Sequence, residues 1–376
     1  MASICTRCAL RIQRASQREG SIIPASSRAF SQSTSSSREF PMFEYSTNDD
    51  LNDALANFRN KHLVPAFLNR REQKLIFSPK QKDYLKENPQ TIELGGEEIE
   101  LQWIDRLTDR PARKKLVKDA LNQIFQTKDG KAWENVGKLM IANQTLKKPL
   151  EEKLQAKIVR KAFTQGRSSH ILTILQQVEK TGMTLKSPCV LHTLVQGFRD
   201  MAMKSNWEKT HVEKALKDMN LVTLMLESEQ HGNTGALRKG DPRRSPEVLG
   251  VMLELAAVYA FKHADAKDVN GIVQRYADRL LSCMSEEHVS PPEDALYLCK
   301  TGPQTAFQQA IPVLHGVFVA NKVLGEKMPQ GEKARQVIAN YESRLSSLAS
   351  ELESRAPEKG TYDYTALEAW RRMIRE

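Results

Sequence analysis

The sequence predicts an all-α protein, arranged as an α-solenoid or an irregular stack of helical hairpins, with one small β-hairpin near the N-terminus. From Pro111 onward, apolar residues recur at helical spacing in nearly every segment. Glycines and prolines divide these segments at short intervals, which favours many helices joined by short loops. Only Thr91 to Ile104 shows the alternation of apolar and polar residues that is typical of strands.

Residues 1–37 predict a targeting signal for an organelle instead of a folded element. The segment contains five arginines, a single acid at Glu19 and a serine-rich end. A basic, serine-rich and acid-poor N-terminus is typical of a mitochondrial transit peptide. The string RAFSQSTSSS, which begins at Arg28, also resembles the cleavage sites of matrix proteases. We therefore expect import into the mitochondrial matrix.

Composition indicates a moderately basic protein that is long enough for a hydrophobic core. The chain has 376 residues and a net charge of +10, and loss of residues 1–37 removes five arginines and one glutamate, which leaves +6. This balance favours RNA, anionic lipid or acidic protein surfaces as partners. The best candidate for a membrane span, Val248 to Phe261, is too short and contains Glu254, so no span is predicted.

Residues 38–110 are expected to form an N-terminal segment with one helix and the β-hairpin. The helix is predicted within Ser46–Leu63, where acids occupy the first turn and apolar residues follow at helical spacing. Prolines then interrupt the region at Pro65, Pro79 and Pro89. Within Thr91–Ile104, the pair Gly95 and Gly96 predicts the turn of the hairpin. We expect the hairpin to pack on the helical body as a cap or to meet a partner.

Residues 111–357 are predicted to form a body of repeat-like helical hairpins, and residues 358–376 a final helix that either caps the stack or docks on a partner. We expect helices at Ala112–Thr127, Lys131–Thr145, Leu150–Gln165, Ser168–Thr181, Pro188–Lys204, Trp207–Glu229, Pro246–Lys262, Lys267–Met284, Pro291–Leu298, Gln304–Leu324, Glu332–Ser354 and Thr365–Arg375. Their short loops suggest that each helix packs on its neighbours in the chain.

One stretch of the body has a repeat-like length. Between Leu150 and Leu185, two predicted helices end at Gly166 and Gly182, and another first helix follows at once. A unit of about thirty-five residues with this glycine spacing resembles a pentatricopeptide repeat. The resemblance covers one to two units, because the next predicted helix, Trp207–Glu229, is too long for the repeat. It implies a role in mitochondrial gene expression, although so few repeats cannot present a useful code for reading bases.

The sequence lacks the patterns that usually mark a catalytic or metal site. It contains no HExxH, no Walker loop, no GxSxG, no GxGxxG after a strand and no paired CxxC beyond residue 37. The eight histidines are dispersed, without the helical spacing that brings metal ligands together, and we expect them to be surface or partly packed residues. We therefore predict no enzyme activity, no cofactor, no metal and no small-molecule substrate.

Basic clusters are the remaining candidates for function, because lysine and arginine neutralise phosphates and a flexible loop can fit a folded RNA backbone. The predicted RNA-binding residues are Arg110, Arg113, Lys114, Lys115, Lys118, Arg238, Lys239, Arg243 and Arg244. Two further groups are Arg70, Arg71 and Lys74, and Arg160, Lys161 and Arg167. The alternative is a solvated helix face and a linker. Since only 6% of residues are aromatic, we expect shape and phosphate contacts instead of base stacking.

Together these features predict a non-catalytic helical scaffold in mitochondrial gene expression. Most concretely, we expect a component or associate of the mitochondrial ribosome that contacts RNA (ribosomal or messenger) and neighbouring ribosomal or assembly proteins. The alternative is an assembly or translation-activation factor for a respiratory-chain complex, which would have the same location, fold and charge. An all-helical matrix enzyme is a third hypothesis, which a deep pocket lined by converging acids or histidines would favour.

Overall fold

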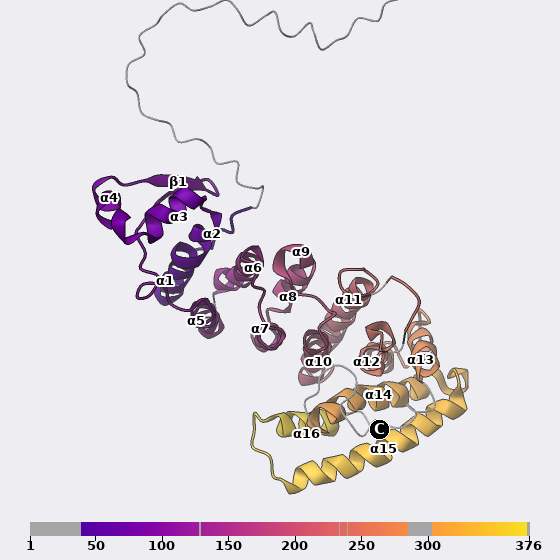
Figure 1. The fold of residues 1–376 in the computed structure, drawn as a ribbon. Coiled ribbons are helices and arrows are strands. Elements are labelled where there is room, and N and C mark those ends of the chain that lie inside the picture. Colours follow the sequence, from indigo (N-terminus) through magenta and orange to yellow (C-terminus); the bar gives the residue numbers. More distant parts are fainter. Residues whose placement is uncertain (1–38, 128, 233, 239, 285–302, 374–376) are drawn as a thin grey trace, which may run out of the picture. The chain divides into compact units, whose positions relative to one another are not determined.

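The computed structural model describes residues 39–127, 129–232, 234–238, 240–284 and 303–373. Helices dominate these residues (Figure 1), and the one sheet among them has two strands. The prediction of a mostly helical protein with a small N-terminal β-hairpin is therefore confirmed. The predicted transit peptide, residues 1–37, and the predicted helix Pro291–Leu298 lie outside the described residues.

The elements follow in a simple order. The N-terminal ones are α1 (Asp49–Phe58), the π-helix η2 (Arg59–Leu63), α2 (Val64–Phe67), α3 (Arg70–Phe77), the 3-10 helix η3 (Pro79–Gln81), α4 (Lys82–Glu87), β1 (Thr91–Leu94) and β2 (Glu97–Glu100). The body contains α5 (Arg113–Gln126), α6 (Gly130–Thr145), α7 (Glu152–Thr164), α8 (Ser168–Leu175), α9 (Val178–Thr181), α10 (Pro188–Lys204), α11 (Lys209–Leu226), the 3-10 helix η4 (Pro242–Arg244), α12 (Pro246–His263), α13 (Ile272–Cys283), α14 (Pro303–Leu324), the 3-10 helix η6 (Gly325–Lys327) and α15 (Gly331–Ser354). The final helix is α16 (Tyr362–Arg371).

The N-terminal segment contains more helix than the sequence predicted. The expected helix is present as α1, but Pro65 does not end it, because the chain continues through η2 and places Pro65 in the first turn of α2, where no N–H is needed. The helix α3 was missed. Its start has a capping box, in which Asn69 accepts from the N–H of Glu72 at 3.0 Å and Glu72 accepts from the N–H of Asn69 at 2.8 Å. That Asn-x-x-Glu spacing is visible in the sequence.

The predicted hairpin is present as β1 and β2. Gly95 and Gly96 both have positive φ, of 64° and 83°, as a two-residue hairpin turn requires. The chain after β2 is fixed to the preceding helices: Ile104 N–H donates to the carbonyl of Ile76 at 2.8 Å, and the Trp103 indole donates to the carbonyl of Ser78 at 3.1 Å. The hairpin therefore packs on the N-terminal helices.

Within the body, helices pack mainly on helices that are close to them in the chain. α6 packs on α8 and α9, α7 packs on α10, and α10 packs on α11 and α12. In Figure 1, α5, α7 and α10 follow one side of this part of the body, whereas α6, α8 and α9 follow the other. The predicted helix Ser168–Thr181 is divided into α8 and α9 at Gln176 and Gln177, and the Thr181 hydroxyl donates to the carbonyls of Ile174 and Gln177 at 3.1 and 2.9 Å.

The most extensive contact between two of the described helices joins α12 and α14. A Cβ atom at Gly316 would lie 2.9 Å from the backbone nitrogen of Glu254, and one at Gly250 would lie 3.0 Å from the backbone nitrogen of Val313. Only glycine permits this approach of the two backbones. The apolar segment Val248–Phe261 thus lies in the interior, and none of the described helices has both the length and the apolar character that a bilayer span needs.

This approach encloses an ionic network between α10, α12 and α14. Arg199 donates from Nε to Glu254 Oε2 at 2.6 Å and from Nη2 to Oε1 at 2.9 Å. His315 Nδ1 lies 2.6 Å from Oε1 of the same carboxylate. All three side chains are at most 2% exposed, so charge-assisted bonds join three helices in the absence of water. The expectation of surface or partly packed histidines is wrong for His315.

The network keeps its charges despite burial. Burial disfavours the ionised carboxylate of Glu254, but Arg199 and His315 outweigh that effect, so the pKa of Glu254 lies below its ordinary value of 4.5. Burial likewise disfavours the cation of Arg199, but Glu254 outweighs it, and the pKa of Arg199 is raised. Arg199 and Glu254 therefore form an ion pair at neutral pH.

A second polar contact lies along the same three helices. His192 Nδ1 lies 2.7 Å from Glu247 Oε1, and Gln196 donates to the same oxygen at 2.6 Å. Gln196 Nε2 also lies 3.4 Å from the carbonyl of Gln308. This carbonyl lacks its usual helical donor, because Pro312, four residues later, has no N–H. Burial lowers the pKa of His192, but Glu247 more than offsets this and raises it overall. These bonds fix the relative register of α10, α12 and α14.

We expect Glu254→Gln to destabilise the protein severely, because it leaves Arg199 as an unpaired charge in the interior. Breaking one side of a buried pair costs about 3 to 5 kcal/mol, which denaturant unfolding at pH 7 would measure. Glu332→Gln, at an exposed pair with Arg335, is the matched control and should leave the free energy of unfolding nearly unchanged.

The cost of Glu254→Gln should also depend on pH. The pKa of Glu254 is lower in the folded state than in the unfolded state. Its contribution to the free energy of unfolding is therefore present above pH 4.5 and disappears as the pH falls through the folded-state pKa. The difference in the free energy of unfolding between wild type and variant should therefore become smaller at acidic pH. A difference at pH 7 no larger than that of Glu332→Gln would contradict the role of this network.

Candidate nucleic-acid interface

The first basic cluster begins in the loop between β2 and α5. The guanidinium groups of Arg106 and Arg110 lie 4.3 and 5.5 Å from the ring centroid of Phe77. Arg110 also donates from Nε to the carbonyl of Lys61 at 3.0 Å. Burial, followed by the charge of Arg106, lowers the pKa of Arg110. Arg110 therefore holds the loop against α3 and η2 and is only partly accessible.

The start of α5 concentrates positive charge. Arg113, Lys114 and Lys115 occupy its first turn, without an acid and without a side-chain cap. The guanidinium of Arg113 donates to the side-chain oxygen of Asn143, and it donates to the carbonyl of Lys148 at 3.2 Å. These bonds fix the start of α5 against the end of α6. Because the N-terminal end of a helix is itself positive, this end of α5 attracts anions.

The lysines of this cluster are accessible. Lys114 Nζ lies 2.5 Å from Glu151 Oε1, but the side chains are 70% and 68% exposed, so water screens the pair. The hydrogen bond and charge of Lys114 lower the pKa of Glu151, with smaller contributions from Lys118 and Arg113. Lys115 and Lys118 are exposed and have no ion-pair partner in the described part of the chain. One carboxylate therefore faces several cations.

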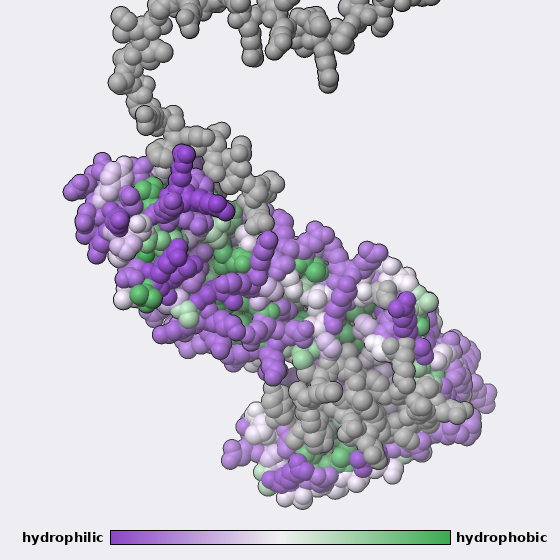
Figure 2. All heavy atoms as spheres, in the orientation of Figure 1, coloured by the Kyte–Doolittle hydropathy of each residue, from purple (hydrophilic) through white to green (hydrophobic). Residues whose placement is uncertain are grey.

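The surface of α7 extends this cluster beyond the residues predicted from the sequence. Lys153, Lys157 and Lys161 are exposed and four residues apart, which places them on one side of α7. Lys157 Nζ lies 5.9 Å from the ring centroid of Phe125 in α5, so the two helices are close. Hydrophilic side chains cover most of the visible face over the middle of the chain (Figure 2). The regular lysine spacing is the signal that could have predicted this extension.

The structure divides the second basic cluster. Arg238 is exposed and Arg244 is half-buried, whereas Lys239 lies outside the described residues. Arg243 is only 6% exposed. The sequence predicted a flexible loop at this position, but the structure buries the side chain of Arg243.

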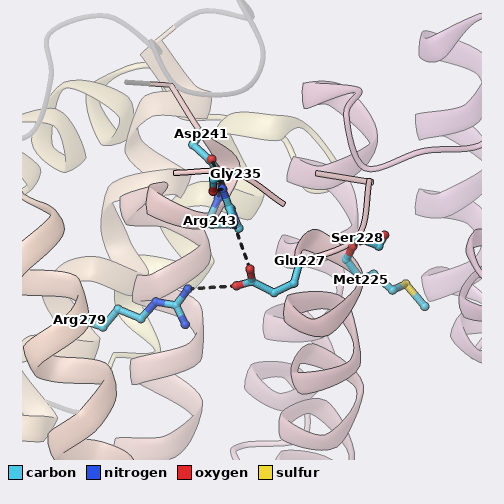
Figure 3. A network of polar contacts seen from close by, with 7 residues as sticks. All are labelled: Met225, Glu227, Ser228, Gly235, Asp241, Arg243 and Arg279. Atoms are coloured by element: carbon cyan, nitrogen blue, oxygen red, sulfur yellow. Dashed lines mark hydrogen bonds and ion pairs between the residues drawn. The ribbon is translucent and has the colours of Figure 1, made fainter. Parts of the chain in front are cut away.

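Arg243 is buried because acceptors surround it (Figure 3). Its Nη2 donates to Asp241 at 2.7 Å and to the carbonyl of Gly235 at 2.9 Å, and its Nη1 donates to Glu227 at 3.0 Å. Hydrogen bonds to Asp241 and then to Glu227 raise the pKa of Arg243. Glu227 also lies 3.7 Å from Arg279 of α13. Arg243 therefore fastens the loop to the end of α11, and protein acceptors occupy its guanidinium.

The buried ionic network is enclosed by protein, with its three side chains at most 2% exposed. Arg199, Glu254 and His315 do not line either of two cavities of the described chain, one of about 350 Å³ between α6, α8 and α9 and one of about 500 Å³ beside β2. No group of histidines, cysteines and acids within the described residues is arranged to hold a metal ion. The chemistry that the surface of α5 and α7 offers is the binding of anions.

Two comparisons with known proteins give matches over most of the chain. The model of a family described as Mrp13, mitochondrial ribosomal protein mS27, matches residues 28–372. The chain is also similar to the small ribosomal subunit protein mS27 of Neurospora crassa, with 27% identity over 368 residues. That alignment covers 90% of this chain and 91% of the relative.

We expect Arg243→Ala to loosen the loop from Gly235 to Ser245, because Asp241 would lose its partner in a buried position. Limited proteolysis should cut this loop faster than in wild type, and the melting temperature should fall. Arg244→Ala removes a neighbouring cation and serves as the control, which should keep the wild-type cleavage rate. Equal resistance of both variants to the protease would refute the fastening role of Arg243.

Proposed function

This chain belongs to the mitochondrial ribosomal protein mS27 family, and from that premise we propose that it holds ribosomal RNA through the cations of α5 and α7. Family membership makes it a non-catalytic component of the mitochondrial ribosome, in the matrix, with ribosomal RNA and ribosomal proteins as its partners. The predicted location, ribosomal role and lack of enzyme activity are thereby confirmed. This favours the ribosomal hypothesis over a respiratory assembly factor and over a matrix enzyme.

The name of the Neurospora crassa relative supports a finer proposal. That relative is a protein of the small ribosomal subunit, and it aligns with nearly the whole of this chain. We propose the same subunit for this protein. The RNA that it contacts would then be the ribosomal RNA of that subunit.

The uncompensated positive charge at the start of α5 carries the proposal of RNA binding. Lys115 and Lys118 are exposed without acidic partners among the described residues, and Lys114 has only the screened partner Glu151. Phosphate groups would supply the missing anions, and the release of counterions from RNA would favour the contact. Arg110 and Arg113, which are held by protein carbonyls and by Asn143, would set the position of this surface.

The loop before α12 would make a second contact. Arg238 is exposed and Arg244 is partly accessible, and Arg243 fastens the backbone from which both project. Lys239 belongs to the same predicted group. A loop that is held at one point can present its cations to a folded RNA without losing much conformational freedom on binding.

We propose that the helices from α7 to α10 are degenerate pentatricopeptide-like hairpins. α7 forms one unit with α8 and α9, α10 begins the next, and α5 lies beside α7. Two such units cannot read a sequence of useful length. The surface is therefore suited to the phosphate backbone and shape of a folded RNA.

Replacing Lys114, Lys115 and Lys118 with glutamine should weaken RNA binding across all sequences. Each lost phosphate contact should reduce the slope of log affinity against log salt by about 0.7 to 0.9. Filter binding of the purified full chain to small-subunit ribosomal RNA fragments, over a series of salt concentrations, would measure both quantities.

The control replaces Lys327, Arg344 and Lys359, three exposed cations of the C-terminal region, with glutamine. The two triple variants have the same net charge, so a difference between them reports position. Equal affinities and equal salt slopes for both would exclude α5 as the RNA contact. Crosslinking in intact mitochondria, followed by sequencing of the attached RNA, would identify the site on the ribosome.

A further inference from the structure

The β-hairpin leaves one edge of its sheet open. Leu101 N–H donates to the carbonyl of Gln90 at 2.8 Å, which makes these two residues a hydrogen-bonded pair at the end of the ladder. Bonded and non-bonded pairs alternate along an antiparallel ladder, so Glu98 and Glu100 occupy non-bonded positions. Their N–H and C=O groups point away from β1, and no residue of the described chain bonds to them. Such an edge can accept another strand.

The same hairpin carries acids that the protein does not neutralise. Glu93 and Glu98 lie directly opposite each other, in the kind of pair whose side chains are closest, and like charges there are destabilising. Glu93, Glu98 and Glu100 are exposed and have no ion-pair partner within the described residues. Only Glu97 is paired, with Arg59 at 3.2 Å. On a chain of net charge +10, this local acidity favours a cationic partner and disfavours RNA.

A cavity of about 500 Å³ lies along this edge. One wall is formed by residues 98–104 of β2 and the following chain, and another by Asn57 of α1 and by Arg59, Asn60 and Lys61 of η2. Its lining also includes apolar Val64, Ile76 and Ile104. There is thus space beside the open edge, with acids on one face of β2 and aliphatic side chains on the other.

We propose that β2 receives an extended segment of a neighbouring protein as a third strand, and that basic and aliphatic residues alternate in this segment. Successive side chains of a strand point to opposite faces, so one set would meet the acids Glu98 and Glu100 and the other would enter the apolar part of the cavity. The bonds along the edge give affinity, and the alternation gives selectivity. The hairpin is a protein-docking site, separate from the basic surface of α5 and α7.

The probe for this proposal is a fluorescein-labelled octapeptide of alternating lysine and valine, titrated with the purified full chain and followed by anisotropy. Binding should become about tenfold weaker or worse, roughly 1.4 kcal/mol, when Glu98 and Glu100 are both replaced by glutamine. The matched control replaces Glu326 and Glu358, two exposed acids elsewhere, with glutamine and should bind as wild type does. The glutamine side chains keep the shape of the hairpin and relieve its charge repulsion, so the melting temperature should not fall.

A second peptide separates strand addition from simple charge attraction. It carries N-methyl groups on every second peptide bond. This removes the N–H donors along one edge of the peptide and keeps every charge. We expect its binding also to be about tenfold weaker or worse, because the open edge would lose its partners. Equal binding of both peptides, or peptide binding unaffected by Glu98→Gln with Glu100→Gln, would overturn the proposal. An RNA oligonucleotide that loses affinity in that variant would instead assign the hairpin to RNA.

Discussion

The buried carboxylate of Glu254 is the constraint on which the C-terminal half of the molecule depends. It must be paired because it has no access to water, and its two partners come from helices that are 55 and 61 residues away in the chain. Gly316, beside His315, and Gly250, one turn before Glu254, allow the backbones close enough for this pairing. Apolar packing alone would tolerate several alignments of α10, α12 and α14, whereas the ionic network tolerates one.

The N-terminal half of the molecule carries a surface on which cations and acids lie on different elements. The cations of α5 and α7 lie on the outer side of stacked helices, where phosphates can reach them, and the acids of the hairpin lie on a separate element. A ribosomal protein must contact RNA and its protein neighbours at once. In the proposed arrangement, this segregation keeps the acidic hairpin from repelling RNA bound by the lysines.

Local patterns predicted the elements, whereas the structure was needed for contacts between distant residues. Helical spacing located α10 from Pro188 to Lys204, and alternation with Gly95 and Gly96 located the hairpin. Asp241 is a local partner of Arg243, but nothing local indicates that Glu227, sixteen residues away at the end of α11, also accepts from it. The pairing of Arg199, Glu254 and His315 likewise depends on the packing of three helices. The stripe of lysines on α7 is different, because its spacing was visible and was overlooked.

A density map of the assembled small subunit of the mitochondrial ribosome would test the central claim most directly, namely that stacked helices present cations to ribosomal RNA. The account predicts RNA phosphates within about 4 Å of the ammonium groups of Lys115 and Lys118, the distance of an ion pair. A map in which α5 and α7 face solvent, or meet only protein, while RNA lies elsewhere on the chain, would contradict it.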